Sequence, residues 1–188
     1  QEPRPWITSI ARAPSGDLWV GGVEVLARLS RGVWSWFDTT SGLPHRWVRS
    51  VAVVPSRGGG ELVFVGGAAG GLTRFDGKGF RSWGASTGLP ADSVSSLLPL
   101  PGGRPGGAWV GTTNGLVRLD ETRWRTVDGR HGLPGLAVLG FAEAPDGGSF
   151  AVATDVGLAR AGRDGKLRVL ARSSGLPDDS IFTVEADG

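Results

Sequence analysis

Short apolar segments bounded by glycine and proline run along the whole chain, and they recur in sets of four. The first segment of each set has apolar residues at its ends and mostly small or polar ones between, which is typical of a half-buried β-strand. Copies of this first segment lie at residues 7–10, 48–51, 94–97, 138–141 and 181–184. The first four copies are followed by proline and a glycine-rich turn, as at Pro14 and Pro145. Because these residues end a hydrogen-bonded ladder, the chain is predicted to reverse there.

Three further segments complete each set. The second lies at residues 18–21, 63–66, 108–111 and 150–153, and the third, with a Leu-x-Arg core, lies at 26–29, 72–75, 116–119 and 158–161. The fourth has an aromatic residue or leucine at one fixed place: Trp34, Phe80, Trp124 and Leu167. Turn sequences such as 76–79 and 163–165 join the segments as tight hairpins. No stretch of 12 residues shows a helical period, so four strands are predicted in each set.

A Gly-Leu-Pro sequence separates one set from the next. Its glycines are Gly42, Gly88, Gly132 and Gly175, spaced 46, 44 and 43 residues apart. A fixed period of this length indicates a repeat architecture, and four short strands per period is the composition of a β-propeller blade. A single blade is marginally stable, but blades arranged around an axis bury one another's apolar faces.

The sequence therefore predicts an all-β fold, a propeller of four-stranded antiparallel blades within one whole or partial domain, residues 1–188. The expected blades cover about residues 6–40, 47–85, 93–129 and 137–172, and residues 178–188 would begin a further blade. The first strand of each blade should lie nearest the axis, where space is smallest. Small residues at one repeat position suit that place: Ser9, Ser50, Ser96, Gly140 and Thr183.

Composition agrees with this fold and removes several kinds of chemistry. The 188 residues include 33 Gly and 12 Pro, as frequent turns require, and 8 Trp, whose large rings suit the interfaces between blades. Cysteine is absent, which excludes disulfides, thiolate catalysis and cysteine metal sites. The net charge is only +2 and the basic residues are dispersed, so no nucleic-acid partner is expected. No apolar run is long enough to span a membrane, so no membrane contact is expected within this segment.

At these repeats the chain resembles a known family, the two-component-regulator propeller repeats. The family pattern is roughly Gly-Leu-Pro, a Ser-Val-x-Ser-Ile strand, an Asp-Gly turn, Leu-Trp-Val-Gly-Thr, a Gly-Leu, and an apolar-Arg-apolar-Asp strand. The copy at residues 88–94 and 108–120 follows it best. The fourth copy departs from it, with Ala151 in the place of tryptophan and residues 161–162 in the place of the apolar-Asp pair.

This resemblance implies the extracytoplasmic or periplasmic sensing region of a bacterial signalling receptor, without catalysis of its own. Its ligand would be a small molecule such as a glycan fragment. The resemblance also implies about seven blades per ring. The chain would then be a piece of a longer sensor, or its ring would be completed by other blades or a second protomer. Closure as a ring of four blades is the alternative.

The residue types that catalysis needs do not form a recognisable pattern. His45 and His131 occupy different repeat positions beside Gly-Leu-Pro, and each is expected to be a solvated loop side chain. No catalytic residue, metal site or cofactor is predicted, because partners at ligand spacing are lacking. Asp-Gly sequences such as 146–148 are explained by turn formation rather than by calcium binding.

Arginine recurs at one position of every repeat: Arg28, Arg74, Arg118 and Arg160. A ring of guanidinium groups could bind an anion. The preferred interpretation is structural, in which each arginine pairs with an acidic residue or lies over a tryptophan.

Positions at which the repeats differ are the better guide to a binding site. The loops between second and third strands should share a rim with the Gly-Leu-Pro loops. On that rim the second copy reads His45-Arg46-Trp47, whereas the third reads Ala-Asp-Ser at 91–93. Trp47 could stack on a sugar, or, like Trp6 one repeat earlier, cover the first blade interface. The candidate ligand-binding residues are Glu24, His45, Arg46, Trp47, Asn114, His131 and Asp155.

Two other functions stay open from the sequence. A scaffold propeller would hold a protein partner on the same rim. A propeller lyase or glycoside hydrolase would need clustered carboxylates, and the available ones occupy different repeat positions: Glu24, Asp92, Asp155 and Asp179.

Overall fold

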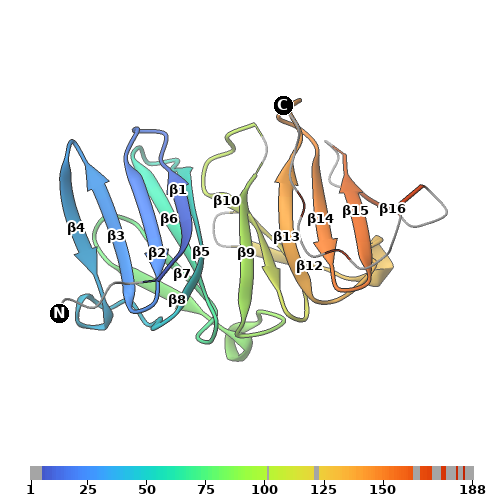
Figure 1. Ribbon diagram of the computed structural model, residues 1–188, viewed down its shortest axis with the longest axis horizontal. Helices are drawn as coiled ribbons and strands as arrows, with labels where there is room; N and C mark the ends of the chain where they lie inside the picture. The colour runs from blue at the N-terminus through green and yellow to red at the C-terminus, as the bar shows by residue number, and fades with distance from the viewer. Residues whose placement is uncertain are drawn as a thin grey trace.

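The computed structural model describes residues 6–100, 102–120, 123–162, 166–170, 175, 176, 181 and 184. They form four separate four-stranded antiparallel sheets, each with its strands in chain order. This confirms the predicted all-β propeller fold with four blades. Figure 1 shows the four sheets standing side by side, with β1–β4 at one end and β13–β16 at the other. The proposed start of a further blade at 178–188 lies outside the described residues, apart from Ile181 and Val184.

The strand bounds are as follows. Blade 1 contains β1 (Ile7–Arg12), β2 (Leu18–Gly22), β3 (Val25–Ser30) and β4 (Val33–Phe37). Blade 2 contains β5 (Val48–Pro55), β6 (Glu61–Gly67), β7 (Leu72–Phe75) and β8 (Phe80–Trp83). Blade 3 contains β9 (Val94–Pro99), β10 (Gly107–Thr112), β11 (Gly115–Asp120) and β12 (Arg123–Val127). Blade 4 contains β13 (Val138–Glu143), β14 (Phe150–Thr154), β15 (Gly157–Ala161) and β16 (Leu167–Leu170).

The first strands of consecutive blades are neighbours, as expected of the innermost strands of a propeller. β5 lies beside both β1 and β9, and β9 lies beside β13. The ladder with the second strand is irregular at one residue in each first strand. In blades 1 and 3 that residue has a hydroxyl, and Thr8 and Ser95 donate hydrogen bonds to the carbonyls of Val48 and Val138 in the next blade. The inner strands are thus tied together by side chains as well as by packing.

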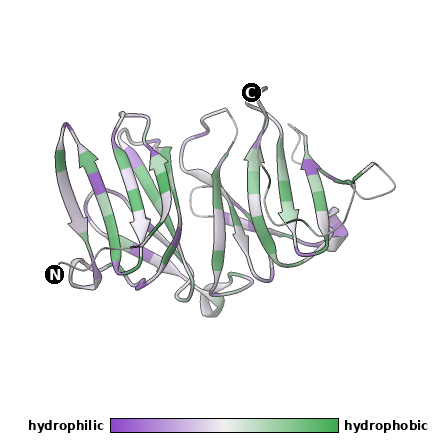
Figure 2. Cartoon of the chain, viewed as in Figure 1, coloured by the Kyte–Doolittle hydropathy of each residue, from purple (hydrophilic) through white to green (hydrophobic). Residues whose placement is uncertain are grey.

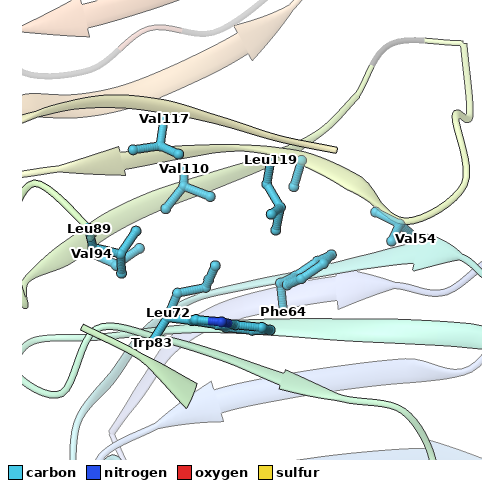
Figure 3. Close-up of a cluster of buried hydrophobic side chains, with 10 residues drawn as sticks. Val54, Phe64, Leu72, Trp83, Leu89, Val94, Val110, Val117 and Leu119 are labelled. Atoms are coloured by element: carbon cyan, nitrogen blue, oxygen red, sulfur yellow. The ribbon is translucent and has the colours of Figure 1, made fainter. Parts of the chain in front are cut away.

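Three apolar clusters fill the spaces between consecutive blades. One joins blades 1 and 2 around Trp19, one joins blades 2 and 3 around Phe64, and one joins blades 3 and 4 around Trp109. Figure 3 shows the middle cluster, with Phe64, Leu72 and Trp83 facing residues of blade 3. Trp19 and Trp109 occupy equivalent surroundings, since each is 2% exposed and each pairs in register with an arginine. Figure 2 shows hydrophobic residues, in green, along strands of all four sheets.

The Gly-Leu-Pro sequence has a structural explanation. A single 3₁₀ turn precedes it in each of the three fully described loops: η1 (Thr39–Ser41), η2 (Ala85–Thr87) and η3 (Gly129–His131). The glycine after each turn is left-handed, with φ of 93°, 102° and 88°, a conformation that favours glycine. The leucine that follows is buried in an interblade cluster, as Leu43, Leu89 and Leu133. The glycine therefore turns the chain and the leucine seals the gap between two blades.

Three of the four repeated third-strand arginines have the structural role that the sequence predicted. Arg28 pairs with Asp17 and lies 5.8 Å from the ring centroid of Trp19. Arg118 lies at the same distance from Trp109, and Arg74 lies 5.7 Å from Trp83. Arg160, beside Ala151, has no such ring and instead donates to the Ser149 hydroxyl at 3.4 Å. The guanidinium groups of Arg28, Arg74 and Arg118 thus lie over tryptophans between blades.

Candidate functional site

The loops entering each blade and the second-to-third-strand turns meet on one rim of the molecule. The backbone N–H of Glu24 donates to the Arg46 carbonyl at 2.6 Å. Equivalent bonds run from Gly71 to Asp92 at 2.8 Å and from Gly115 to Leu136 at 2.7 Å. These bonds fasten each blade to the loop that enters the next one. They also make Arg46, Asp92 and Leu136 equivalent, so comparison of the repeats at this rim is structurally justified.

A cavity of about 250 Å³ opens on this rim where blade 1 meets blade 2. Glu24, Asp38, Thr39, His45 and Arg46 line it. Three of these were candidates from the sequence, and the fold brings them together from the β2–β3 turn and the loop before β5. The cavity thus joins an acidic side chain and a basic one at the mouth of an interblade gap.

The cavity's charged groups differ in how firmly they are held. Arg46 and Glu24 form an ion pair of 3.6 Å between side chains that are 82% and 69% exposed. An exposed pair of this kind contributes little to stability, so both groups can exchange partners with a ligand. Asp38 is fixed, because it accepts hydrogen bonds at the start of η1 from Thr40 and Ser41. Hydrogen bonds lower the pKa of Asp38. The bond from the Thr40 hydroxyl has the largest effect, and the bond from the Ser41 backbone N–H comes next.

His45 is buried, and the expectation that it is a solvated loop side chain is wrong. It is only 1% exposed. Its Nε2 lies 2.7 Å from the Thr73 hydroxyl and its Nδ1 lies 3.3 Å from the Ala69 carbonyl. A neutral ring that donates through Nδ1 and accepts at Nε2 satisfies both contacts. His45 therefore supports the cavity wall from behind, with almost no surface for a ligand.

The glycine-rich turn after β6 makes the space that His45 fills. A Cβ atom at Gly67 would collide with the imidazole ring, and one at Gly70 would lie 3.1 Å from its Nδ1. The other entry loops have Ala91 and Gly135 at the histidine position. Their partner turns need no such space. The imidazole of His45 therefore fills space that is free because Gly67 and Gly70 have no side chains.

Sequence reasoning missed several of these residues. Thr73 is fully buried and its hydroxyl lies 2.8 Å from that of Ser82, so a short polar chain leads from His45 to the outer strand. The signal was present, because Thr73 replaces the Ala27, Val117 and Ala159 of the other blades. Asp38 and Thr39 were also missed, since they precede Gly-Leu-Pro and resemble ordinary turn residues.

Trp47 follows Arg46 in the chain, is not among the residues that line the cavity, and is 51% exposed. Its backbone forms an isolated bridge with Val23, and its carbonyl accepts a hydrogen bond from Ala68 at 3.0 Å. Trp6, at the matching place, is 77% exposed and bonds to Val23 in the same way. Both backbones close the rim, while both indole rings keep a free surface.

The remaining candidates lie on other parts of the rim. The Asn114 amide donates to the Pro90 carbonyl at 3.2 Å, and Asp155 is bonded through its backbone to Ala137. His131 lies 2.9 Å from Asp128, which begins η3. None of these three lines the cavity beside Arg46. Asn114 and Asp155 each bond to the neighbouring entry loop and His131 bonds within its own, so the three are not joined into one site.

Two larger clefts open on the opposite rim. One, of about 480 Å³, separates blades 1 and 2 beside Trp19, Arg28 and Glu61. The other, of about 350 Å³, separates blades 3 and 4 beside Trp109 and Arg118. Both use the tryptophan and arginine that recur in the repeat. We regard the Glu24–Arg46 cavity as the better candidate, because its lining is specific to one interface.

Neither a metal centre nor a bilayer-crossing helix is found in the residues that the structure describes. No three His, Cys, Asp or Glu side chains in this part of the chain gather closely enough to hold an ion. The same residues include no helix with the length and apolar character that crossing a bilayer requires.

Comparison with known proteins gives a fold likeness but no sequence family. No protein-family model matches the chain, and no curated protein sequence matches it. The extracellular domain of BT3049, from B. thetaiotaomicron and assigned to a hybrid two-component system, aligns with a TM-score of 0.76. It is 18% identical over 93% of this chain and 24% of its own. The chain spans about a quarter of the solved structures that it matches.

Two further structures show the same likeness. The extracellular domain of BT4673, also from B. thetaiotaomicron and assigned to a hybrid two-component system, has a TM-score of 0.62 and 18% identity over 94% of this chain and 24% of its own. PorZ of Porphyromonas gingivalis, a surface component of the type-IX secretion system, has a TM-score of 0.66 and 17% identity over 96% and 24%. The fold is therefore shared with extracellular bacterial proteins, and two of these three are assigned to two-component signalling.

The buried histidine makes stability sensitive to mild acid. Burial lowers the pKa of His45 from its ordinary 6.5, and the Ala69 hydrogen bond opposes this only in part. Below pH 6.5 the unfolded chain binds a proton at His45 more readily than the folded chain, so stability falls as the pH falls. We expect wild type to lose up to about 1 kcal/mol between pH 6.5 and 5.5. Urea unfolding at both values measures the loss.

The His45→Gln variant should lose much less over this interval, whereas His131→Gln should behave like wild type. The carboxylates with lowered pKa values, such as Asp38, do not interfere, because their ordinary value is already 3.8. An equal loss in His45→Gln and wild type would show that another group causes the acid sensitivity.

Proposed function

We propose that this chain is part of the extracytoplasmic, ligand-sensing propeller of a bacterial signalling receptor, and that it belongs to the two-component-regulator propeller repeats. The observation that carries the proposal is its alignment, over 93–94% of the chain, with extracellular domains assigned to two-component systems. The repeat pattern of the sequence supports the same assignment independently. Signal output would come from parts of a receptor beyond these blades.

The proposed ligand site is the rim cavity at Glu24 and Arg46, together with the indole of Trp47. An exposed aromatic ring beside a loosely held ion pair is suited to a small polar ligand with a flat apolar face, such as a glycan fragment. Trp47 would stack on the ring face while Arg46 and Glu24 bind hydroxyl or carboxylate groups. The module would bind without converting its ligand, so the response would be a shift between two receptor arrangements.

A panel of neutral and acidic oligosaccharides tests this proposal. A ligand at ten times its Kd stabilises the fold by about 1.4 kcal/mol, which corresponds to a rise of roughly 3–6 °C in Tm. We expect one sugar of the panel to produce this rise, and to shift the indole N–H signal of Trp47 in the NMR spectrum. No reducing sugar should be released.

Paired variants locate the site. Arg46→Ala and Trp47→Ala should abolish the rise in Tm while leaving the fold intact, because both side chains are largely exposed. Glu61→Gln, in the larger cleft on the opposite rim, is the matched control and should keep the response. Loss of the response only in Glu61→Gln would move the site to that cleft, and release of reducing sugar would indicate an enzyme.

A scaffold function is the second candidate, and the likeness to PorZ favours it. PorZ is a surface component of a secretion system and aligns over 96% of this chain. A scaffold would bind a protein on the same rim and would not respond to the sugar panel.

A further inference from the structure

The larger cleft on the rim opposite Arg46, between blades 1 and 2, has two walls of different chemistry. Blade 1 contributes Trp19 and Arg28, and blade 2 contributes Glu61 and Asp76. We call this space of about 480 Å³ the Glu61 cleft. Apolar side chains also line it: Pro14, Pro55, Val63 and Phe75. Apolar lining with a few polar groups is the usual composition of a small-molecule site, and the polar groups decide what such a site binds.

The blade-1 wall has hydrogen-bond donors that the fold leaves unused. The indole N–H of Trp19 is buried and has no acceptor in the described part of the chain. Arg28 donates to Asp17 through Nε at 2.8 Å and Nη2 at 2.5 Å, which leaves its Nη1 group for a further acceptor. Because a buried donor is rarely left unpaired in a folded protein, this wall is suited to an acceptor such as a carboxylate.

The blade-2 wall has two carboxylates. Glu61 accepts hydrogen bonds from the backbone N–H and the hydroxyl of Ser15, at 2.6 and 3.1 Å. One oxygen of Asp76 accepts from the backbone N–H groups of Lys78 and Gly79, and these bonds lower the pKa of Asp76, so it stays ionised at neutral pH. Each carboxylate oxygen has about two acceptor sites, so both side chains can also bind an ammonium group.

The cleft between blades 3 and 4 has the same first wall. Trp109 and Arg118 line it and are in register with each other, as Trp19 and Arg28 are in blade 1. The tryptophan and arginine therefore belong to the repeat, and they do not distinguish one cleft from the other.

The two clefts differ at the carboxylates. In the cleft between blades 3 and 4, glycines occupy the places of Glu61 and Asp76, counted from the register pair of second and third strands: Gly148 and Gly162. Arg104 also lines that cleft. The charged lining is thus two arginines and one aspartate there, but one arginine and two carboxylates in the Glu61 cleft. A cationic group is favoured only in the second case.

We propose that the Glu61 cleft binds a free amino acid. The ligand's carboxylate accepts hydrogen bonds from Trp19 and Arg28 of blade 1. Its ammonium group bonds to Glu61 and Asp76 of blade 2, and its apolar side chain packs on Phe75. Charge complementarity on both walls selects a zwitterion over a neutral sugar or a simple anion. The site is separate from the proposed sugar site on the other rim.

Isothermal titration calorimetry with the common L-amino acids tests the proposal. We expect apolar or basic members to bind, and aspartate and glutamate to bind more weakly, because they add a carboxylate to a cleft that already has two. The N-acetyl derivative of the tightest ligand lacks the ammonium group, and its decarboxylated amine lacks the carboxylate. Each should bind about tenfold more weakly or less. Undiminished binding of either derivative, or no binding of any amino acid at millimolar concentration, overturns the proposal.

Variants of the blade-2 wall locate the site. Glu61→Gln and Asp76→Asn should each weaken binding by about tenfold or more, the usual effect of losing a hydrogen bond to a charged group. Both should stay folded, because an amide oxygen still accepts the backbone bonds that hold each loop. The control Asp120→Asn changes the residue in the place of Asp76 in blade 3 and should bind like wild type. Wild-type affinity in either blade-2 variant contradicts the proposal.

Trp19→Phe tests the blade-1 wall, because it removes the indole N–H and retains an aromatic ring. It should also weaken binding, and the blade-2 variants decide the matter if it does not fold. Arg46→Ala separates this site from the proposed function. It should lose the sugar response and keep amino-acid binding, whereas Glu61→Gln should do the reverse, so failure of one proposal leaves the other testable.

Discussion

Replacing Trp109 by alanine is expected to lower the free energy of unfolding by about 3–5 kcal/mol, the usual cost of removing a buried large aromatic side chain. Trp109 is 2% exposed and its ring lies 5.0 Å from that of Phe150 in blade 4. The Arg118 guanidinium lies 5.8 Å from the centroid of the same ring. The variant therefore leaves a cavity between two blades and a guanidinium without its aromatic partner. Urea denaturation followed by circular dichroism measures the loss.

Trp47→Ala is the matched control for this prediction. Trp47 is half exposed, and its contribution to the rim is made by backbone groups that alanine also has. We expect a change of no more than about 0.5 kcal/mol, as for most surface substitutions. Similar losses in the two variants would contradict the assignment of Trp109 to the core and Trp47 to the rim.

Replacing Gly71 by alanine should cost about 2–5 kcal/mol although it adds only one methyl group. Gly71 has a φ of 78°, where an L-residue is strained by roughly 1–2 kcal/mol. The new Cβ would also overlap the carbonyl oxygen of Trp83, with Gly84 Cα close behind it. Both neighbours are backbone, so relief requires movement of β8, at an overpacking cost of about 1–3 kcal/mol. The midpoint of urea unfolding should fall accordingly.

Gly77→Ala separates the two causes of this loss. Gly77 has a similar φ of 87°, but nothing lies within 4 Å of its added Cβ. It should cost only the backbone strain of roughly 1–2 kcal/mol. If both variants lose the same amount, the contact with Trp83 is not rigid and the close approach of β7 and β8 has been overestimated.

Much of the fold could be predicted because each repeat is specified by residues that lie close together in the chain. The glycine of each Gly-Leu-Pro specifies a left-handed residue after a 3₁₀ turn, and its leucine fills the gap between blades. Large rings were expected at the interfaces between blades, and Trp19 and Trp109 lie there. These features depend on residues close in the chain, so comparing four copies was enough to read them.

The candidate site was predicted only in part. Glu24 and Arg46 were correctly placed on one rim, because loops that occupy equivalent repeat positions lie on the same side of a propeller. His45 was misjudged, since its burial depends on glycines more than 20 residues later in the chain. Asn114, His131 and Asp155 shared the rim but not the cavity.

The sequence by itself determined the blade, its four strands and the order of the blades, because each of these follows from local periodicity and turn chemistry. Only the tertiary structure decided which polar side chains are buried and where a cavity opens. The physical reason is that these properties belong to interfaces between blades. Packing at an interface depends on side chains from both blades, so the sequence of one blade alone does not determine it.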